Sequence, residues 1–131
     1  MAKITFMGAG STVFAKNVLG DVMLTPAIQE CEIALYDIDG ARLEESYLVI
    51  EAINQKYNGG RAKIGKYLGV EQRKAALRGA NFVVDAIQVG LYDPCTIIDF
   101  EIPKKYGLRQ TIADTLGIGG IFRGLRTIAV L

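Results

Sequence analysis

The chain opens with a short apolar segment at residues 3–7 that runs directly into a glycine turn, in which Gly8 and Gly10 stand two positions apart. A mostly apolar run without clear alternation predicts a strand that is covered on both faces, as in a parallel sheet. A helix is expected to begin at about Ser11. A strand that enters a helix through a tight glycine turn is the first unit of an open α/β sheet. This opening limits the possible folds more than any other feature of the chain.

The alternation of strand and helix continues further along the sequence. Further strands are predicted at 31–37, 62–67 and 81–87, and helices at 11–24, 41–57, 71–77 and 94–106, the last with Pro94 at its first helical position. Because parallel strands joined by helices need right-handed crossovers, the strand order should be 3-2-1-4. The predicted fold class is therefore α/β, a doubly wound parallel sheet of the Rossmann-like type.

Two of these helices carry apolar residues at helical spacing, which predicts the faces that they bury. In the first helix the stripe comprises Val13, Phe14, Val18, Leu19 and Val22. In the second helix it comprises Leu43, Tyr47, Ile50 and Ile53.

The residues after the fourth strand contain no convincing fifth strand, apart from a possible short one at 109–112. A glycine-rich turn at 116–120 leads into a last helix that is expected to run to Leu131. Such an end would leave an unpaired parallel edge. We therefore expect residues 1–131 to be one truncated domain, the N-terminal portion of a longer enzyme.

The glycine turn is a candidate pyrophosphate site. Gly8 allows the tight turn, and the absence of a Cβ at Gly10 allows a ligand to approach the backbone closely. The helix that opens with Ser11 and Thr12 would direct its unpaired N–H groups and its positive dipole end at the anion. The alternative is a tight turn without a ligand.

Asp37 ends the second strand 27 positions after Gly10. Dinucleotide-binding folds place there the carboxylate that accepts hydrogen bonds from both adenosine ribose hydroxyls, and this favours NAD over NADP. No arginine follows Asp37 directly to pair with a 2′-phosphate. The alternative is that Asp37 caps a turn. Asp39 is expected to cap the next helix, because it immediately precedes it, and Arg42 to be solvated.

Five further residues are candidates for ligand contacts. Gln88 and Gly90 follow the fourth strand at the carboxyl edge of the sheet, beside the switch point where ligands bind, and could touch the nicotinamide end. The alternative for Gln88 is a surface loop. Asp114 precedes a glycine turn whose amides could receive an anion or sugar hydroxyls, or which could be only the start of a helix. Arg123 and Arg126 share one face of that helix, so either could reach the ligand, although at least one should be solvated.

Composition excludes several function classes. The net charge is +1, from 15 basic and 14 acidic residues, without a basic run, so neither nucleic acid nor an anionic membrane is an expected partner. The start lacks a signal sequence, and no apolar run reaches the roughly 18 residues of a membrane span, so a cytoplasmic protein is expected. Cys31 and Cys95 suit reduced thiols, with Cys95 in structural packing. The chain contains no histidine, so its residues offer no metal site.

Several motifs together resemble the N-terminal domain of glycoside hydrolase family 4, with the bacterial α-galactosidases as the most similar branch. The likeness covers essentially the whole chain. The segments that carry it are Gly8-Ala-Gly-Ser-Thr-Val-Phe14, Leu35-Tyr-Asp-Ile-Asp39 with Arg42-Leu43, Gln88-Val-Gly90, Ala113-Asp-Thr-Leu-Gly117 with Gly119-Gly120, and Leu125-Arg-Thr127.

The resemblance implies hydrolysis that depends on NAD⁺ and a divalent metal, typically Mn²⁺. In that family, the hydride leaves carbon 3 of the sugar, the aglycone is eliminated, water adds and the hydride returns. The metal ligands, a cysteine and a histidine, and the base lie beyond this chain in the family, and Cys95 does not match that cysteine.

Carried over to this sequence, the family's pattern assigns residues to three parts of the site. NAD would be held by Gly8, Gly10, Ser11, Thr12 and Asp37, its nicotinamide end by Gln88 and Gly90, and the sugar and metal would lie near Asp114. The expected partner is a small glycoside, and the expected assembly a homo-oligomer. This chain alone is expected to be inactive. Two alternatives stay open, which are half of a malate- or lactate-type dehydrogenase and a free-standing nucleotide-binding module.

Overall fold

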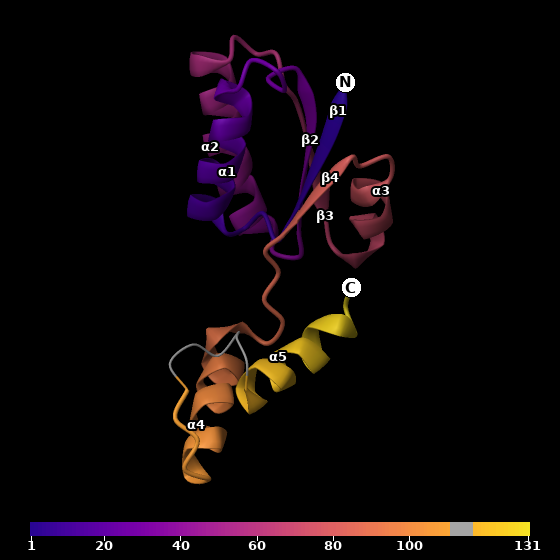
Figure 1. The fold of residues 1–131 in the computed structure, drawn as a ribbon. Coiled ribbons are helices and arrows are strands. Elements are labelled where there is room, and N and C mark those ends of the chain that lie inside the picture. Colours follow the sequence, from indigo (N-terminus) through magenta and orange to yellow (C-terminus); the bar gives the residue numbers. More distant parts are fainter. Residues whose placement is uncertain (111–116) are drawn as a thin grey trace. The chain divides into compact units, whose positions relative to one another are not determined.

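The computed structural model describes residues 1–110 and 117–131. Its sheet has four parallel strands in the order β3-β2-β1-β4, as predicted (Figure 1). The strands are β1 (Ala2–Met7), β2 (Cys31–Asp37), β3 (Lys63–Leu68) and β4 (Phe82–Asp85). Met7, the last residue of β1, pairs with Tyr36 on one side and with Asp85 on the other. The carboxyl ends of β1, β2 and β4 therefore meet at one edge of the sheet.

Helices cover both faces of this sheet. α1 (Thr12–Leu24) and α2 (Gly40–Tyr57) lie side by side on one face, and α3 (Arg73–Leu77), preceded by the single turn η1 (Val70–Gln72), lies on the other (Figure 1). This arrangement confirms the doubly wound α/β class. β4 is shorter than the predicted strand at 81–87, although Ala86 N–H still donates to the Met7 carbonyl at 2.8 Å.

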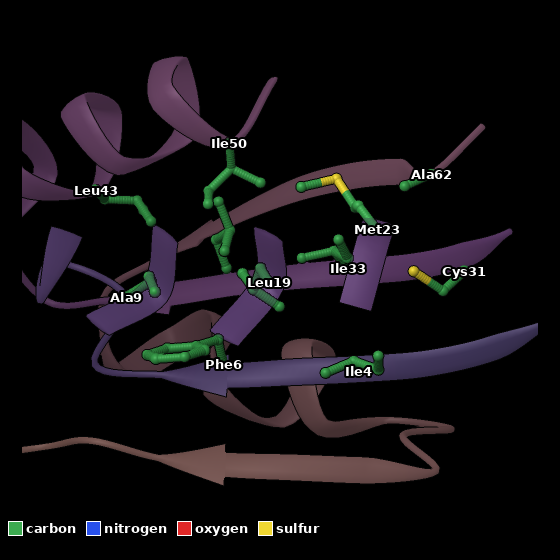
Figure 2. Close-up of a cluster of buried hydrophobic side chains, with 12 residues drawn as sticks. Ile4, Phe6, Ala9, Leu19, Met23, Cys31, Ile33, Leu43, Ile50 and Ala62 are labelled. Atoms are coloured by element: carbon green, nitrogen blue, oxygen red, sulfur yellow. The ribbon is translucent and has the colours of Figure 1, made fainter. Parts of the chain in front are cut away.

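The core fills the space between the sheet and the pair α1 and α2 (Figure 2). The apolar stripe predicted for α2 is confirmed, because Leu43 and Ile50 are buried and Tyr47 and Ile53 are packed against the core. The stripe predicted for α1 is partly wrong. Val13 is 70% exposed, and the face that α1 buries comprises Ala15, Leu19 and Met23, with Val18 and Val22 packed beside it.

The two polar residues of β1 are buried within this apolar setting. Lys3 Nζ donates to the Arg78 carbonyl at 2.8 Å and pairs with Glu32 at 3.2 Å. Thr5, which is fully buried, donates its hydroxyl to the Ala76 carbonyl on α3 at 2.8 Å. Both groups are thus satisfied, as buried polar atoms must be.

The chain divides into two compact units, Met1–Ala86 and Ile87–Leu131. The second unit contains η2 (Leu91–Thr96), α4 (Ile97–Lys105) and α5 (Ile118–Ile128). Three expectations need correction here. Pro94 lies inside η2 after a cis peptide bond and does not start the helix, Arg109 and Gln110 are not in a strand, and the last helix ends at Ile128. The assignment of residues 1–131 to a single domain stays a prediction. Among the described residues, no helix is both long and apolar enough to span a bilayer.

Candidate functional site

The glycine turn is fastened to the end of β2. Gly8 has a φ of 83°, in the left-handed region that favours glycine. The N–H groups of Gly8 and Ala9 both donate to the Tyr36 carbonyl at 2.9 Å, and Ser11 N–H donates to the Gly8 carbonyl at 3.1 Å. These bonds hold the turn in a fixed position at the carboxyl edge of the sheet.

Gly10 lies directly against Asp37. Its N–H donates to Asp37 Oδ2 at 2.6 Å, so the carboxylate at the end of β2 faces the turn that follows β1. A Cβ at Gly10 would lie 2.8 Å from that oxygen and 2.9 Å from the Cβ of Arg42. Glycine is therefore required at this position by contacts within the protein itself, in addition to any contact with a ligand.

Asp37 also caps its own turn, which was the alternative to a role in ribose binding. Asp37 Oδ1 accepts from Asp39 N–H at 2.9 Å. Asp39 caps α2 as predicted, because its side chain accepts from the N–H groups of Ala41 at 3.0 Å and Arg42 at 3.1 Å. A carboxylate has about four acceptor sites, so each Asp37 oxygen can accept a further hydrogen bond. Its structural bonds therefore leave it able to bind hydroxyl groups.

The first turn of α1 provides unpaired backbone donors. Ala15 N–H donates to the Ser11 carbonyl at 2.9 Å, which is the first bond of the helical ladder. The N–H groups of Thr12, Val13 and Phe14 precede it and have no acceptor within the helix. Ser11 is exposed, and its side chain makes no capping bond to the described helix. These donors and the helix dipole make this end of α1 suitable for an anion.

Ser46 is a polar contact of the turn that is not among the residues predicted from the sequence. It lies on α2 with no exposed surface, donates to the Ala9 carbonyl at 2.6 Å and lies 2.9 Å from Thr12 Oγ1. Its position was visible in the helical spacing, because Ser46 stands between Leu43 and Ile50 on the buried stripe of α2. A polar residue on such a stripe indicates a specific polar partner.

The remaining predicted site residues belong to the second unit or lie outside the described residues. Gln88 Nε2 donates to Thr96 Oγ1 at 2.9 Å. Gly90 has a φ of 90°, and a Cβ there would lie 2.3 Å from Cys95 Sγ, so Cys95 packs against this glycine. Asp114 lies outside the described residues. The structure thus brings Gly8, Gly10, Ser11, Thr12 and Asp37 together within the first unit, whereas Gln88 and Gly90 belong to the second.

Arg126 is engaged within the protein. Its guanidinium forms two hydrogen bonds with the carboxylate of Asp99, which is 1% exposed, and Nη1 lies 2.9 Å from Oδ1. These hydrogen bonds raise the pKa of the Arg126 guanidinium. The pair joins α4 to α5, so it accounts for Arg126 without a ligand. Arg123 on the same helix is half-buried.

The described residues do not suit a metal ion. Across residues 1–110 and 117–131, no three cysteine, aspartate or glutamate side chains lie close enough together to hold one.

Comparison with known proteins identifies the family. Residues 3–131 match the sequence profile of the family 4 glycosyl hydrolases. The chain belongs to this family. Among its relatives are an α-galactosidase of Bacillus subtilis (strain 168), 63% identical over the whole chain, and an α-glucosidase of Erwinia rhapontici, 34% identical over 96% of it. The chain spans 29% and 27% of these two proteins.

A solved structure confirms the fold of this part of the family. The 6-phospho-β-glucosidase of Thermotoga maritima, solved with manganese, NAD⁺ and glucose-6-phosphate, is 24% identical, with a TM-score of 0.77. The match covers 99% of this chain and 29% of that protein. Family 4 membership therefore agrees with the Rossmann-like fold predicted from the glycine turn.

Proposed function

We propose that this chain is the NAD-binding part of a family 4 glycosyl hydrolase that acts on α-galactosides. Family membership and 63% identity to an α-galactosidase support the reaction class and the sugar. The same membership favours the hydrolase over a malate- or lactate-type dehydrogenase and over a free-standing module. The hydrolase as a whole would be longer, because the chain spans less than a third of these relatives.

The observation that carries the proposal is the hydrogen bond between Gly10 N–H and Asp37 Oδ2. This bond keeps the Asp37 carboxylate close to the start of α1. It therefore supports a site in which both bind the same ligand, the carboxylate its ribose and the helix start its pyrophosphate. Asp37 would accept the ribose hydroxyls, and the N–H groups at the start of α1 would bind the pyrophosphate, with Ser11 at its edge. An anionic Asp37 would repel a 2′-phosphate, so we propose NAD and not NADP.

Bound NAD⁺ would supply a reversible two-electron oxidant, as needed for oxidation at carbon 3, elimination, addition of water and re-reduction. The residues described here would bind and orient it. Gln88 and Gly90 are proposed to line its nicotinamide end, and Asp114 to lie on the sugar side. The described residues do not fit Mn²⁺, so we assign no step of the reaction to a metal held by them.

Calorimetric titration of the 131-residue chain with NAD⁺ and NADP⁺ tests this proposal. We expect NAD⁺ to bind, NADP⁺ to bind at least tenfold more weakly, and nitrophenyl α-galactoside to remain intact. At 100 times its Kd, NAD⁺ should stabilise the chain by about 2.7 kcal/mol, or roughly 10 °C in melting temperature. Equal affinity for both dinucleotides would contradict the role of Asp37, and rapid release of nitrophenol would contradict the assignment of this chain to cofactor binding alone.

A further inference from the structure

The hydroxyl of Ser46 links α2 to the glycine turn and to the start of α1. Ser46 Oγ donates to the Ala9 carbonyl at 2.6 Å, and both residues are fully buried. A serine hydroxyl has a single proton. Since that proton is directed at Ala9, Thr12 must be the donor in the 2.9 Å contact between the two hydroxyls. The Thr12 hydroxyl proton is therefore used inside the protein.

We propose that Ser46 is a positioning residue for the dinucleotide, which it orients through Ala9 and Thr12 without touching it. This inference rests on the proposed function, since it concerns the same glycine turn. It also assigns the role of Thr12. Thr12 would contribute its backbone N–H to the pyrophosphate, while Ser11, which is exposed, would provide the hydroxyl of the turn.

Ser46 can orient the dinucleotide because the segment from Ala9 to Thr12 donates no helical hydrogen bond of its own, since the first such bond of α1 runs from Ala15 N–H to the Ser11 carbonyl. The Ala9 carbonyl is buried, and Ser46 is the donor that it faces from α2. Without the hydroxyl, this carbonyl loses its partner and the Thr12 side chain loses its acceptor. The segment could then rotate, and the N–H groups at the start of α1 would no longer be held in one direction. Preorganised donors bind an anion more tightly than donors that must be ordered on binding.

The same helix, α2, is capped by Asp39, whose N–H donates to Asp37 Oδ1 at 2.9 Å. α2 and its cap therefore contact both halves of the proposed site, Asp39 at the ribose carboxylate and Ser46 at the Ala9 carbonyl of the glycine turn. A change at Ser46 should act on the phosphate half alone.

The test compares Ser46→Ala with Thr5→Val. Thr5 is an equally buried hydroxyl that donates to a backbone carbonyl at 2.8 Å, but its partner is Ala76 on the other face of the sheet. Both variants lose one buried hydroxyl-to-carbonyl bond, so both should lower the melting temperature by a few degrees. We expect only Ser46→Ala to raise the Kd for NAD⁺, by about fivefold, the ratio that one neutral hydrogen bond contributes. Thr12→Val should raise the Kd less. The double variant should bind NAD⁺ as Ser46→Ala does, because both substitutions break the same chain of hydrogen bonds from Thr12 through Ser46 to Ala9.

Unchanged NAD⁺ affinity in a folded Ser46→Ala variant, while the wild type binds, would overturn this inference and leave the proposed function intact. Equal weakening by Thr5→Val would also overturn it, because the effect would then be one of general stability. A wild type that binds no NAD⁺ would overturn both. If Ser46→Ala does not fold, Ser46→Cys, which nearly keeps the volume and weakens the donor, is measured in its place and read by the same criteria.

Discussion

The contact between Gly10 and Asp37 leads to a prediction for Gly10→Ala. The φ of Gly10 lies outside the left-handed region, so an alanine there meets no backbone strain, and its effect is one of space alone. Its Cβ would lie 2.8 Å from Asp37 Oδ2 and 2.9 Å from Arg42 Cβ, well inside the 3.4 Å at which ordinary contact begins. Neither neighbour yields easily, because Asp39 N–H holds the carboxylate from its other side and the Arg42 Cβ is fixed to α2.

The expected loss follows from two contributions. Overpacking at a fixed site costs about 2 kcal/mol, and loss of a hydrogen bond to a charged acceptor adds about 1 kcal/mol or more. A total of about 3 kcal/mol corresponds to a fall of roughly 10 °C in melting temperature for a chain of this size. The affinity for NAD⁺ should fall with it, since the displaced carboxylate is the proposed ribose ligand.

Gly20→Ala is the matched control for Gly10→Ala. Gly20 lies in α1 without a positive φ, and a Cβ added there would meet no atom within 4 Å outside the backbone of its own helix. Alanine at this position should therefore stabilise the helix by about 0.5 to 1 kcal/mol. Calorimetric unfolding of the two variants should thus give melting-temperature shifts of opposite sign. A Gly10→Ala variant that melts with the wild type and binds NAD⁺ equally well would refute the contact between the turn and Asp37.

Three further predictions concern charged and thiol groups. Asp37→Asn should raise the Kd for NAD⁺ about tenfold, because the NH₂ group of the amide would face one of the two N–H groups that now donate to the carboxylate. The preference for NAD⁺ over NADP⁺ should become smaller in the same titrations, because the amide carries no charge to repel the 2′-phosphate. Arg126→Met should destabilise the second unit by about 3 kcal/mol, because it leaves the buried Asp99 carboxylate without its partner. Urea unfolding measures this loss, and a value below about 1 kcal/mol would contradict a buried pair. Burial raises the pKa of the Cys31 thiol, so the folded state keeps a proton that the unfolded state releases above about pH 8.5. The free energy of unfolding should therefore fall as the pH rises past that value, and it should fall less in Cys31→Ala. A thiol reagent should label the half-buried Cys95 before the buried Cys31, and equal labelling rates would contradict the burial of Cys31.

The local sequence was sufficient to predict the elements whose pattern is strong. β1 and β2 were predicted because a strand covered on both faces is a short run of mostly apolar residues, and the stripe of α2 because its apolar residues recur at helical spacing. The spacing between Gly10 and Asp37 likewise predicted a carboxylate near the turn. The predictions failed where packing against other elements of the fold decides which residues are buried. The buried face of α1 turned out to be that of Ala15, because an alanine lets two helices and a sheet approach closely, whereas the larger Val13 remains outside.

The chain's order of strands, glycine turn and helices determined the α/β class and the strand order, because crossover handedness and turn chemistry depend on short segments. Only the tertiary structure decided which polar groups of the turn are already paired. The bond from Gly10 to Asp37 spans 27 positions, and the contact between Thr12 and Ser46 spans 34. The first forms because the turn after β1 lies against the end of β2, and the second only when α2 packs against the start of α1, so neither hydrogen bond can be read from the sequence pattern alone.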